Sequence, residues 1–112
     1  MTVRVLVADD QEPFRRAAGA VVAATAGFTL VGSASSGEEA VAMASTLSPD
    51  LVLLDVRMPG IGGVEAARRI RAPLKVLIST YPATEAARAA GSRFLRKEDF
   101  GPAALRALWQ AR

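Results

Sequence analysis

The chain has 112 residues and a mass of 11.7 kDa, the size of one domain, and its 51% apolar and 22% charged residues are typical of a compact fold. Its net charge of +3 combines 14 basic with 11 acidic residues, so a nucleic-acid partner is neither required nor excluded. Because the chain has no His and no Cys, a Ser-His-Asp or Cys-His nucleophile, a disulfide and the usual structural zinc site are excluded.

The first third of the chain predicts two strands with a helix between them. Residues 3–8 are rich in β-branched side chains and end at Asp9 and Asp10, which is typical of a strand buried on both faces of a parallel sheet. Pro13 suits the first turn of a following helix. Residues at helical spacing give this helix one common face: Phe14, Ala17, Ala18, Val21, Val22 and Thr25. Gly27 would end the helix, and residues 28–34 predict the second strand.

The middle of the chain predicts a second helix, a third strand and a third helix. Ser36 and Glu39 form an S-x-x-E capping box at the start of a helix over residues 37–47. Residues 51–54 predict a third strand, which Asp55 closes. The turn-rich segment RMPGIGG then leads to a helix over residues 64–71.

The last third predicts a fourth strand over residues 75–79, a short helix over 84–90 and a brief fifth strand over 93–95 that leads to Lys97. Residues 99–102 would cap a final helix. The alternation of strands and helices predicts an open parallel sheet with right-handed crossovers and helices on both faces. In such α/β sheets, ligands bind beyond the carboxyl ends of the strands.

Side chains that can react or bind a ligand lie at or just after the ends of four of the five predicted strands. They are Asp9 and Asp10 after the first, Asp55 after the third, Ser79 and Thr80 at the end of the fourth, and Lys97 after the fifth. Three neighbouring carboxylates repel one another unless a cation joins them, and Mg²⁺ prefers oxygen ligands of this kind. Lys97 adds a mobile charge for a phosphoryl oxygen or for Asp55. Together they predict phosphoryl transfer onto a carboxylate.

Each of these residues also has a structural interpretation. A single Asp after a strand is usually a turn or helix cap, Ser79 could cap a loop, and Lys97 could be a solvated charge. Phe94 and Trp109 are more often core residues than signalling elements. It is the joint placement at one edge of the sheet that favours a functional interpretation.

Four segments carry a family likeness: VADDQ at residues 7–11, LLDVRMPG at 53–60, LIST at 77–80 and FLRK at 94–97. Together they resemble the receiver domain of bacterial two-component response regulators, over nearly the whole chain. They look like the branch whose receivers often precede a helix-turn-helix output domain. The resemblance implies a doubly wound, flavodoxin-like sheet of order 2-1-3-4-5. Residues 1–112 would form a single receiver domain without an output domain.

The resemblance also assigns roles to the residues at the strand ends. Asp55 would accept a phosphoryl group from a histidine of a sensor kinase, and Lys97 would pair with that group. The Mg²⁺ ligands would be Asp10 directly, Asp9 largely through water, Asp55, and the backbone carbonyl of Arg57. The switch hydroxyl would be Ser79, with Thr80 as the alternative, and the switch aromatic would be Phe94.

These roles describe a cytoplasmic, phosphorylation-dependent signalling switch. Its partners would be a sensor histidine kinase and an output domain or downstream protein, with transcription as the regulated process and a homodimer formed on phosphorylation. Its chemistry would be limited to self-phosphorylation from small donors and self-dephosphorylation. No apolar run approaches about 18 residues, so no membrane contact is expected, and these residues show no nucleic-acid recognition helix.

Three features depart from the family pattern. Gly62 stands where an acidic residue is common, and Glu98 follows Lys97 where many members have Pro. The segment from Ser79 to Lys97 is several residues short, which predicts a truncated helix over residues 84–90 and an altered partner surface there.

Three other functions compete with this interpretation. A phosphatase of the haloacid dehalogenase type would need a second Asp two residues after Asp55, where this chain has Arg57. A nucleotide-binding module would need G-x-x-x-x-G-K-[ST] or G-x-G-x-x-G, and neither occurs. A pseudo-receiver that binds proteins without being phosphorylated remains the alternative, because of the short helix.

Overall fold

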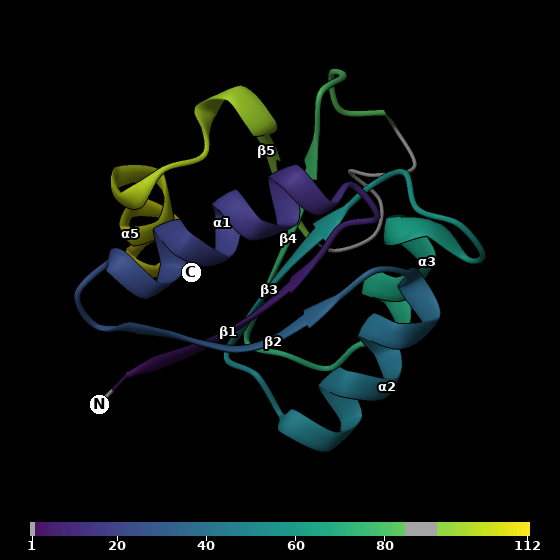
Figure 1. The fold of residues 1–112 in the computed structure, drawn as a ribbon, viewed down its shortest axis with the longest axis horizontal. Helices are drawn as coiled ribbons and strands as arrows, with labels where there is room; N and C mark the ends of the chain where they lie inside the picture. The colour runs from purple at the N-terminus through teal and green to yellow at the C-terminus, as the bar shows by residue number, and fades with distance from the viewer. Residues whose placement is uncertain (1, 85–91) are drawn as a thin grey trace.

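The computed structural model describes residues 2–84 and 92–112 (Figure 1). Within these residues, five parallel strands form one sheet in the order β2-β1-β3-β4-β5. The strands are β1 (Val3–Ala8), β2 (Phe28–Ala34), β3 (Leu51–Asp55), β4 (Leu74–Ser79) and β5 (Arg93–Arg96). The doubly wound sheet and its strand order are thus confirmed.

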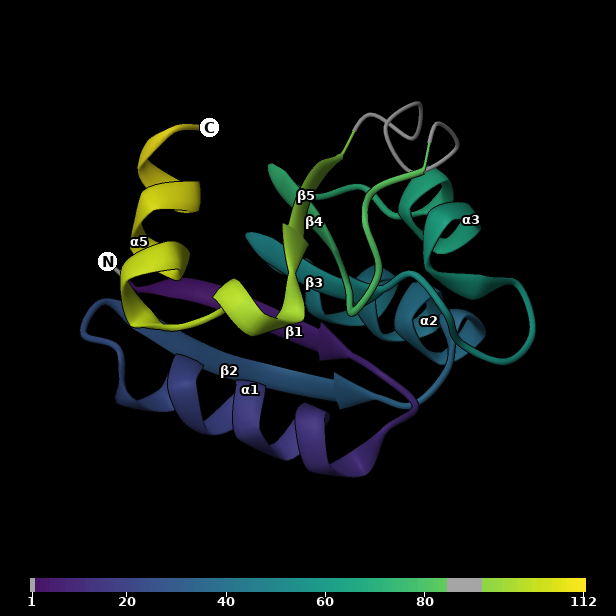
Figure 2. The same ribbon diagram turned by 90° about the horizontal axis from the view of Figure 1, so that it is seen from above.

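Helices cover both faces of the sheet, as Figures 1 and 2 show. On one face lie α1 (Glu12–Ala24) and α5 (Pro102–Gln110), and on the other lie α2 (Gly37–Leu47) and α3 (Gly62–Arg69). A short 3₁₀ helix, η1 (Lys97–Asp99), connects β5 to α5. Of the predicted helix over residues 84–90, all but Thr84 lies outside the described residues.

The central strands divide the core into two halves. Along β1, Val5 and Val7 pack toward α1 and α5, whereas Leu6 and Ala8 pack toward α2 and α3. All five residues of β3 are buried, which explains why its sequence is a continuous apolar run instead of an alternating one. Each fully buried Val or Leu contributes about 1.5–3 kcal/mol through the hydrophobic effect. The buried strands therefore form a rigid base for the loops at their carboxyl ends.

The predicted start of α2 is confirmed by its hydrogen bonds. The backbone N–H of Glu39 donates to Ser36 Oγ at 3.1 Å. In return, Glu39 Oε1 accepts from the N–H of Ser35, one residue before the cap, at 2.9 Å. The cap satisfies backbone donors that have no partner within the helix.

The start and the end of α3 differ from the prediction, because tertiary contacts set both. The helix spans Gly62–Arg69, two residues earlier at each end than the predicted 64–71. The N–H of Gly63 donates to the carbonyl of Val56 at 3.0 Å, which ties the first turn to the end of β3. At the other end Ile70 is extended and buried, and Pro73 keeps the preceding residue out of the helical region.

The prediction that residues 99–102 cap the last helix was wrong in part. The N-cap of α5 is Gly101, which has no side chain to accept a hydrogen bond, and Asp99 belongs to η1 instead. Pro102 does occupy the first turn. The predicted α1 face was also imperfect: Ala18 and Val22 are buried, but Ala17 is exposed and Gly19 takes its place in the packing.

The chain connections at the carboxyl ends of the strands converge at one edge of the sheet (Figure 2). The connection after β1 leads to α1, the one after β3 leads to α3, and η1 follows β5. In the described ranges, none of the helices has both the length and the apolar character needed to cross a membrane. The parallel order of the strands is what places the sequence-distant site residues at one edge.

Candidate functional site

A cleft of about 380 Å³ opens at the carboxyl ends of the strands. Its lining contains most of the residues that the sequence singled out, and the full lining is Asp10, Gln11, Asp55, Arg57, Ser79, Thr80 and Lys97. These residues come from the ends of β1, β3, β4 and β5, so four strands contribute to one site. Asp9 lies beneath the cleft and is buried.

Three carboxylates meet in this cleft. One oxygen each of Asp9, Asp10 and Asp55 lies within 4.8 Å of the others. The pairing of β1 with β3, in which Ala8 is opposite Leu54, brings the residues after both strands side by side. Asp9 and Asp55 are buried, with 0% and 5% of their surface exposed, and Asp10 is half-buried.

Backbone groups orient two of these carboxylates. The N–H of Gln11 donates to Asp9 Oδ1 at 2.8 Å, and the N–H of Arg57 donates to Asp55 Oδ1 at 3.4 Å. Each bond joins a carboxylate to the backbone two residues further on, as in an Asx turn. In addition, the Arg15 guanidinium donates to the carbonyl of Asp9 at 2.8 Å, which fastens the turn to α1.

Lys97 reaches into the acidic cluster from the end of β5. Its ammonium nitrogen lies 2.7 Å from Asp9 Oδ2 and 3.5 Å from Asp55 Oδ2. Only 12% of its side-chain surface is exposed. Sequence reasoning paired Lys97 with a phosphoryl group or with Asp55 and did not anticipate that Asp9 would be its nearer partner.

Burial is the main cause that raises the pKa of Asp55 to about 6, and the negative charge of Asp9 acts in the same direction. The charge of Lys97 and the hydrogen bond from the Arg57 N–H act against this increase in pKa. The pKa of this carboxyl is thus near neutral pH, which is common for groups at functional sites.

The two candidate switch hydroxyls have different environments. Ser79 ends β4 and is buried, and its Oγ accepts a hydrogen bond from the N–H of Tyr81 at 3.0 Å. Thr80 is exposed, and its carbonyl accepts a hydrogen bond from the Arg96 guanidinium at 2.9 Å. Both line the cleft.

Phe94 lies beside the site and not in the cleft. It is half-buried on β5 and packs against the core under α2 and α3. With Ser79 and Tyr81 it lines a second, small cavity of about 40 Å³. A hydroxyl that faces the cleft and an aromatic ring thus border the same small space.

Two aromatic contacts of the site were missed by sequence reasoning. The Arg57 guanidinium lies 4.4 Å from the centre of the Tyr81 ring, at the rim of the cleft. The Lys97 ammonium lies 4.5 Å from the centre of the Phe14 ring. The position of Phe14 in the first helical turn after the acidic pair was the available signal, but helical periodicity assigned it to the core.

The donor groups of the cluster fit a hard divalent cation. Such ions prefer carboxylate, carbonyl and water oxygens, and three carboxylates converge here. Within residues 2–84 and 92–112, the Asp10 carboxylate has no hydrogen bond or ion pair, and the buried Asp9 Oδ2 accepts no well-directed hydrogen bond. The Asp10 oxygens are therefore free to bind a cation, whereas Asp9 and Asp55 each have an oxygen paired with Lys97.

The structure shows the local conformation at two positions that depart from the family pattern, Gly62 and Glu98. Gly62 has a φ of +75°, a conformation in which an acidic side chain would be strained. The carboxylate of Glu98 pairs with the Arg96 guanidinium at 3.3 Å, and the peptide bond between Lys97 and Glu98 is trans.

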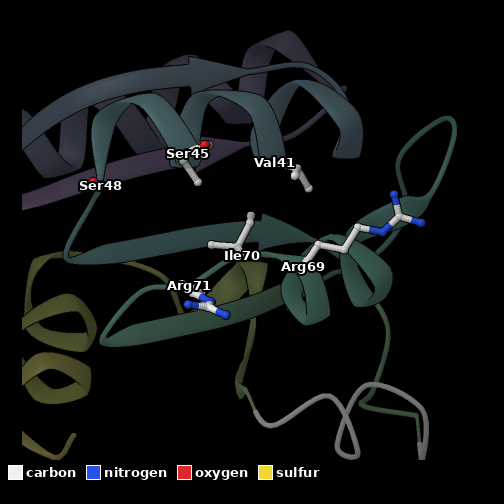
Figure 3. Close-up of a pocket in the computed structure, with 7 residues that line it drawn as sticks. Val41, Ser45, Ser48, Arg69, Ile70 and Arg71 are labelled. Atoms are coloured by element: carbon white, nitrogen blue, oxygen red, sulfur yellow. The ribbon is translucent and has the colours of Figure 1, made fainter.

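A second hollow, of about 400 Å³, lies between α2 and α3 (Figure 3). Ile70 forms its floor, Ser45 comes from the last turn of α2, and Ser48 is the residue that caps the end of this helix. Arg69 extends away from Ile70 and pairs with Glu65 at 2.9 Å. None of the residues that the sequence singled out lines this hollow.

Comparison with known proteins identifies the family of this chain. The sequence model of the response regulator receiver domain matches residues 5–108. The chain therefore belongs to the receiver domain family, whose members are signalling modules.

Curated relatives agree with this assignment. The chain is 48% identical over 68 residues to the response regulator GacA of Pseudomonas viridiflava, which covers 61% of this chain and 32% of GacA. It is 46% identical over 87 residues to protein-glutamate methylesterase/protein-glutamine glutaminase 2 of Anaeromyxobacter dehalogenans, covering 76% of this chain and 26% of that protein. The chain spans about a third or less of the length of these relatives.

Two solved receiver domains share the fold over nearly their whole length. The signal receiver domain of the response regulator NarL from Mycobacterium tuberculosis has a TM-score of 0.89 at 30% identity, with 99% of this chain and 98% of that chain covered. The response regulator domain of Thermotoga maritima CheB has a TM-score of 0.87 at 28% identity, with 99% and 96% covered.

Proposed function

We propose that this receiver is a phosphorylation-dependent switch in which Asp55 accepts the phosphoryl group. The observation that carries the proposal is the convergence of Asp9, Asp10 and Asp55 within 4.8 Å, with the Lys97 ammonium 2.7 Å from Asp9 and 3.5 Å from Asp55. This arrangement offers a nucleophilic carboxylate, further acidic ligands and a mobile cation in one cleft.

The transfer uses the side chains of Asp55 and Lys97 in the cleft. An Asp55 carboxylate oxygen attacks phosphorus, and the bond from phosphorus to the donor breaks. The leaving group, which is the histidine of a sensor kinase or the carboxylate of a small acyl phosphate, departs with the bonding electron pair. Because the pKa of Asp55 is about 6, most of its carboxyl groups are ionised and nucleophilic at pH 7 and above. Lys97 neutralises part of the charge on the transferred group.

Mg²⁺, when bound, would neutralise phosphoryl charge and align the group with its acceptor. Asp10 would hold it directly, Asp9 largely through water, and Asp55 and the backbone carbonyl of Arg57 would complete the protein ligands. The convergence of the three carboxylates within 4.8 Å supports this assignment.

The phosphorylated Asp55 would act on β4 and its neighbours. A phosphoryl group carries about −1.5 to −2 charge and three acceptor oxygens near neutral pH. Ser79 would turn its hydroxyl toward one of these oxygens, and its bond with the Tyr81 N–H would rearrange. Phe94 borders the same small cavity and would change rotamer with it. The burial of Ser79 beside Asp55 supports it over Thr80.

The biological setting is proposed from the relatives. A sensor histidine kinase would supply the phosphoryl group, and an output domain or downstream protein would respond, with a homodimer formed on phosphorylation. The likeness to the response regulator GacA supports such an output, for which we propose transcription in the cytoplasm. Residues 1–112 would act as one receiver domain, with no direct contact to nucleic acid or membrane and no chemistry beyond self-phosphorylation and self-dephosphorylation.

Intact-mass measurement after treatment with a small acyl-phosphate donor and Mg²⁺ tests the proposal. The wild-type chain should gain one phosphoryl group, and the Asp55→Asn variant should gain none. Asp10→Ala should lose the dependence on Mg²⁺. A wild-type chain that stays unmodified would support the pseudo-receiver instead, as a protein-binding module that works without phosphorylation.

A further inference from the structure

The ammonium of Lys97 has a third contact besides its two carboxylates. It lies 4.5 Å from the centre of the Phe14 ring, a distance at which a cation is attracted to an aromatic face. Phe14 stands in the first turn of α1, four residues after Asp10. The connection between β1 and α1 therefore supplies both an anion, Asp9, and an aromatic face to the same ammonium.

The Phe14 ring is held in place independently of Lys97. Its centroid is 6.3 Å from that of the Phe100 ring, and the two rings are inclined by 56°. Both rings pack against the core half under α1 and α5. The N–H of Phe100 also donates to the Lys97 carbonyl at 3.2 Å, so the turn that carries Lys97 is tied to the same ring pair.

A neutral aromatic contact has a specific advantage at this position. Lys97 has a long flexible side chain, and the carboxylates that hold it are the ones a divalent cation would use. Cation binding at Asp9 and Asp55 weakens their attraction for the ammonium, whereas the Phe14 ring keeps its attraction. An acidic side chain in place of Phe14 would hold Lys97 too, but it would cancel the positive charge that the phosphoryl group requires.

We propose that Phe14 is a positioning residue whose aromatic face keeps the Lys97 ammonium beside Asp55 during phosphoryl transfer. The role in transfer rests on the function proposed above, but the contact between ring and ammonium does not. Phe14 also contributes to the core, and a side chain of similar volume such as Leu would preserve that packing. The test must therefore distinguish the effect of the aromatic face of Phe14 from the effect of its apolar volume on core packing.

A double-mutant cycle measures whether Phe14 acts through Lys97. With a small acyl-phosphate donor and saturating Mg²⁺, Phe14→Leu should slow phosphorylation by about fivefold to tenfold, and Phe14→Tyr should stay within about twofold of the wild type. In a Lys97→Met background, Phe14→Leu should cause no further loss. Phe28→Leu is the matched control, because Phe28 packs against the same core half from β2.

Either of two kinetic results would overturn the proposal: phosphorylation of Phe14→Leu at the wild-type rate, or the same slowing by Phe14→Leu in the Lys97→Met background. Thermal unfolding shows whether Phe14→Leu folds, and Phe14→Met replaces it if it does not.

NMR of the Lys97 side chain keeps this inference distinguishable from the proposed function. The chain has two lysines, Lys75 and Lys97, so the Lys97→Met spectrum assigns the ε-methylene signals. Without donor or Mg²⁺, the Lys97 signal should show an upfield ring-current shift that Phe14→Leu removes and Phe14→Tyr keeps. If the wild-type chain takes no phosphoryl group, the proposed function fails. The NMR spectrum alone then shows whether the Phe14 ring holds the Lys97 ammonium. An unshifted wild-type signal would overturn it.

Discussion

The Lys97 ammonium forms its closest ion pair with Asp9, at 2.7 Å, and this pair is buried. The distance to the proposed phospho-acceptor, Asp55, is longer at 3.5 Å. In the protein without a bound cation, Lys97 thus offsets the repulsion among the carboxylates. It occupies oxygens that a metal ion would need, so Lys97 and Mg²⁺ compete for Asp9.

Lys97→Met should therefore tighten Mg²⁺ binding while it slows phosphorylation. Removal of a positive charge next to Asp9 leaves the carboxylates more negative. We expect the Mg²⁺ dissociation constant to fall by about tenfold, roughly 1.4 kcal/mol, in isothermal titration calorimetry. Lys75→Met is the control, because Lys75 donates to the carbonyl of Ala67 and does not line the cleft. Weaker Mg²⁺ binding by Lys97→Met would contradict the competition.

The stability of the metal-free protein should depend on pH through Asp55. Its pKa is raised from 3.8 to about 6 by burial and by the charge of Asp9. The protonated form is favoured in the folded state, so the contribution of Asp55 to stability is fully present below pH 4 and is lost as pH rises through 6. The loss amounts to about 2–3 kcal/mol by pH 8.

Urea unfolding with a chelator, at several values between pH 4.5 and 8, measures this dependence. Asp55→Asn cannot ionise, so it should gain stability relative to the wild type as pH rises. Asp99→Asn, which changes an exposed acid, should follow the wild-type curve. If Asp55→Asn and the wild type showed the same pH dependence, the pKa of Asp55 would not be raised in the folded protein.

Ser79→Ala should separate phosphorylation from the conformational response. The variant keeps every acidic residue of the cleft, so its phosphoryl uptake should stay within about threefold of the wild type. The change in the Tyr81 amide signal on phosphorylation should shrink by more than half in two-dimensional NMR, because Ser79 Oγ is the partner of that N–H. Thr80→Ala is the comparison and should respond like the wild type. The reverse pattern would make Thr80 the switch hydroxyl.

Gly63→Ala should destabilise the protein by at least about 2 kcal/mol. A Cβ atom at Gly63 would lie 2.0 Å from the Asp55 carbonyl oxygen and 3.0 Å from Val56 Cα, and both are backbone atoms that cannot turn aside. Gly101→Ala is the matched control, since a Cβ there meets no atom within 4 Å. Chemical unfolding of both variants checks the difference. Equal stabilities would show that α3 can shift away from β3.

The sequence predicted the sheet well because its strands differ sharply from their surroundings. The run from Leu51 to Leu54 has no polar residue, and Asp55 follows at once, so both the strand and its end were visible. The gathering of acidic residues followed from parallel order alone. The boundaries of α3 were less predictable, because its first turn is fixed by the hydrogen bond from the Gly63 N–H to the Val56 carbonyl across the loop. Glycine has a low helix propensity, so Gly62 and Gly63 do not indicate the start of a helix in the sequence.

Side-chain contacts within the site were the part that the sequence did not reveal. Lys97 lies closer to Asp9 than to Asp55 by less than one ångström. Asp9 is 88 positions from Lys97 in the sequence, and Asp55 is 42 positions from it. The position of the Phe14 ring depends on how α1 packs beside η1. Neither follows from residue spacing, because each is determined by the conformation of a side chain after the fold has formed.

Chemical location of the phosphoryl group tests the central claim most directly. Borohydride reduces an aspartyl phosphate to homoserine, so mass spectrometry of the digested, reduced protein identifies the residue that carried it. The account predicts homoserine at position 55 and at no other position. Homoserine at position 9 or 10, or a stable phosphate on Ser79 or Thr80, would contradict it.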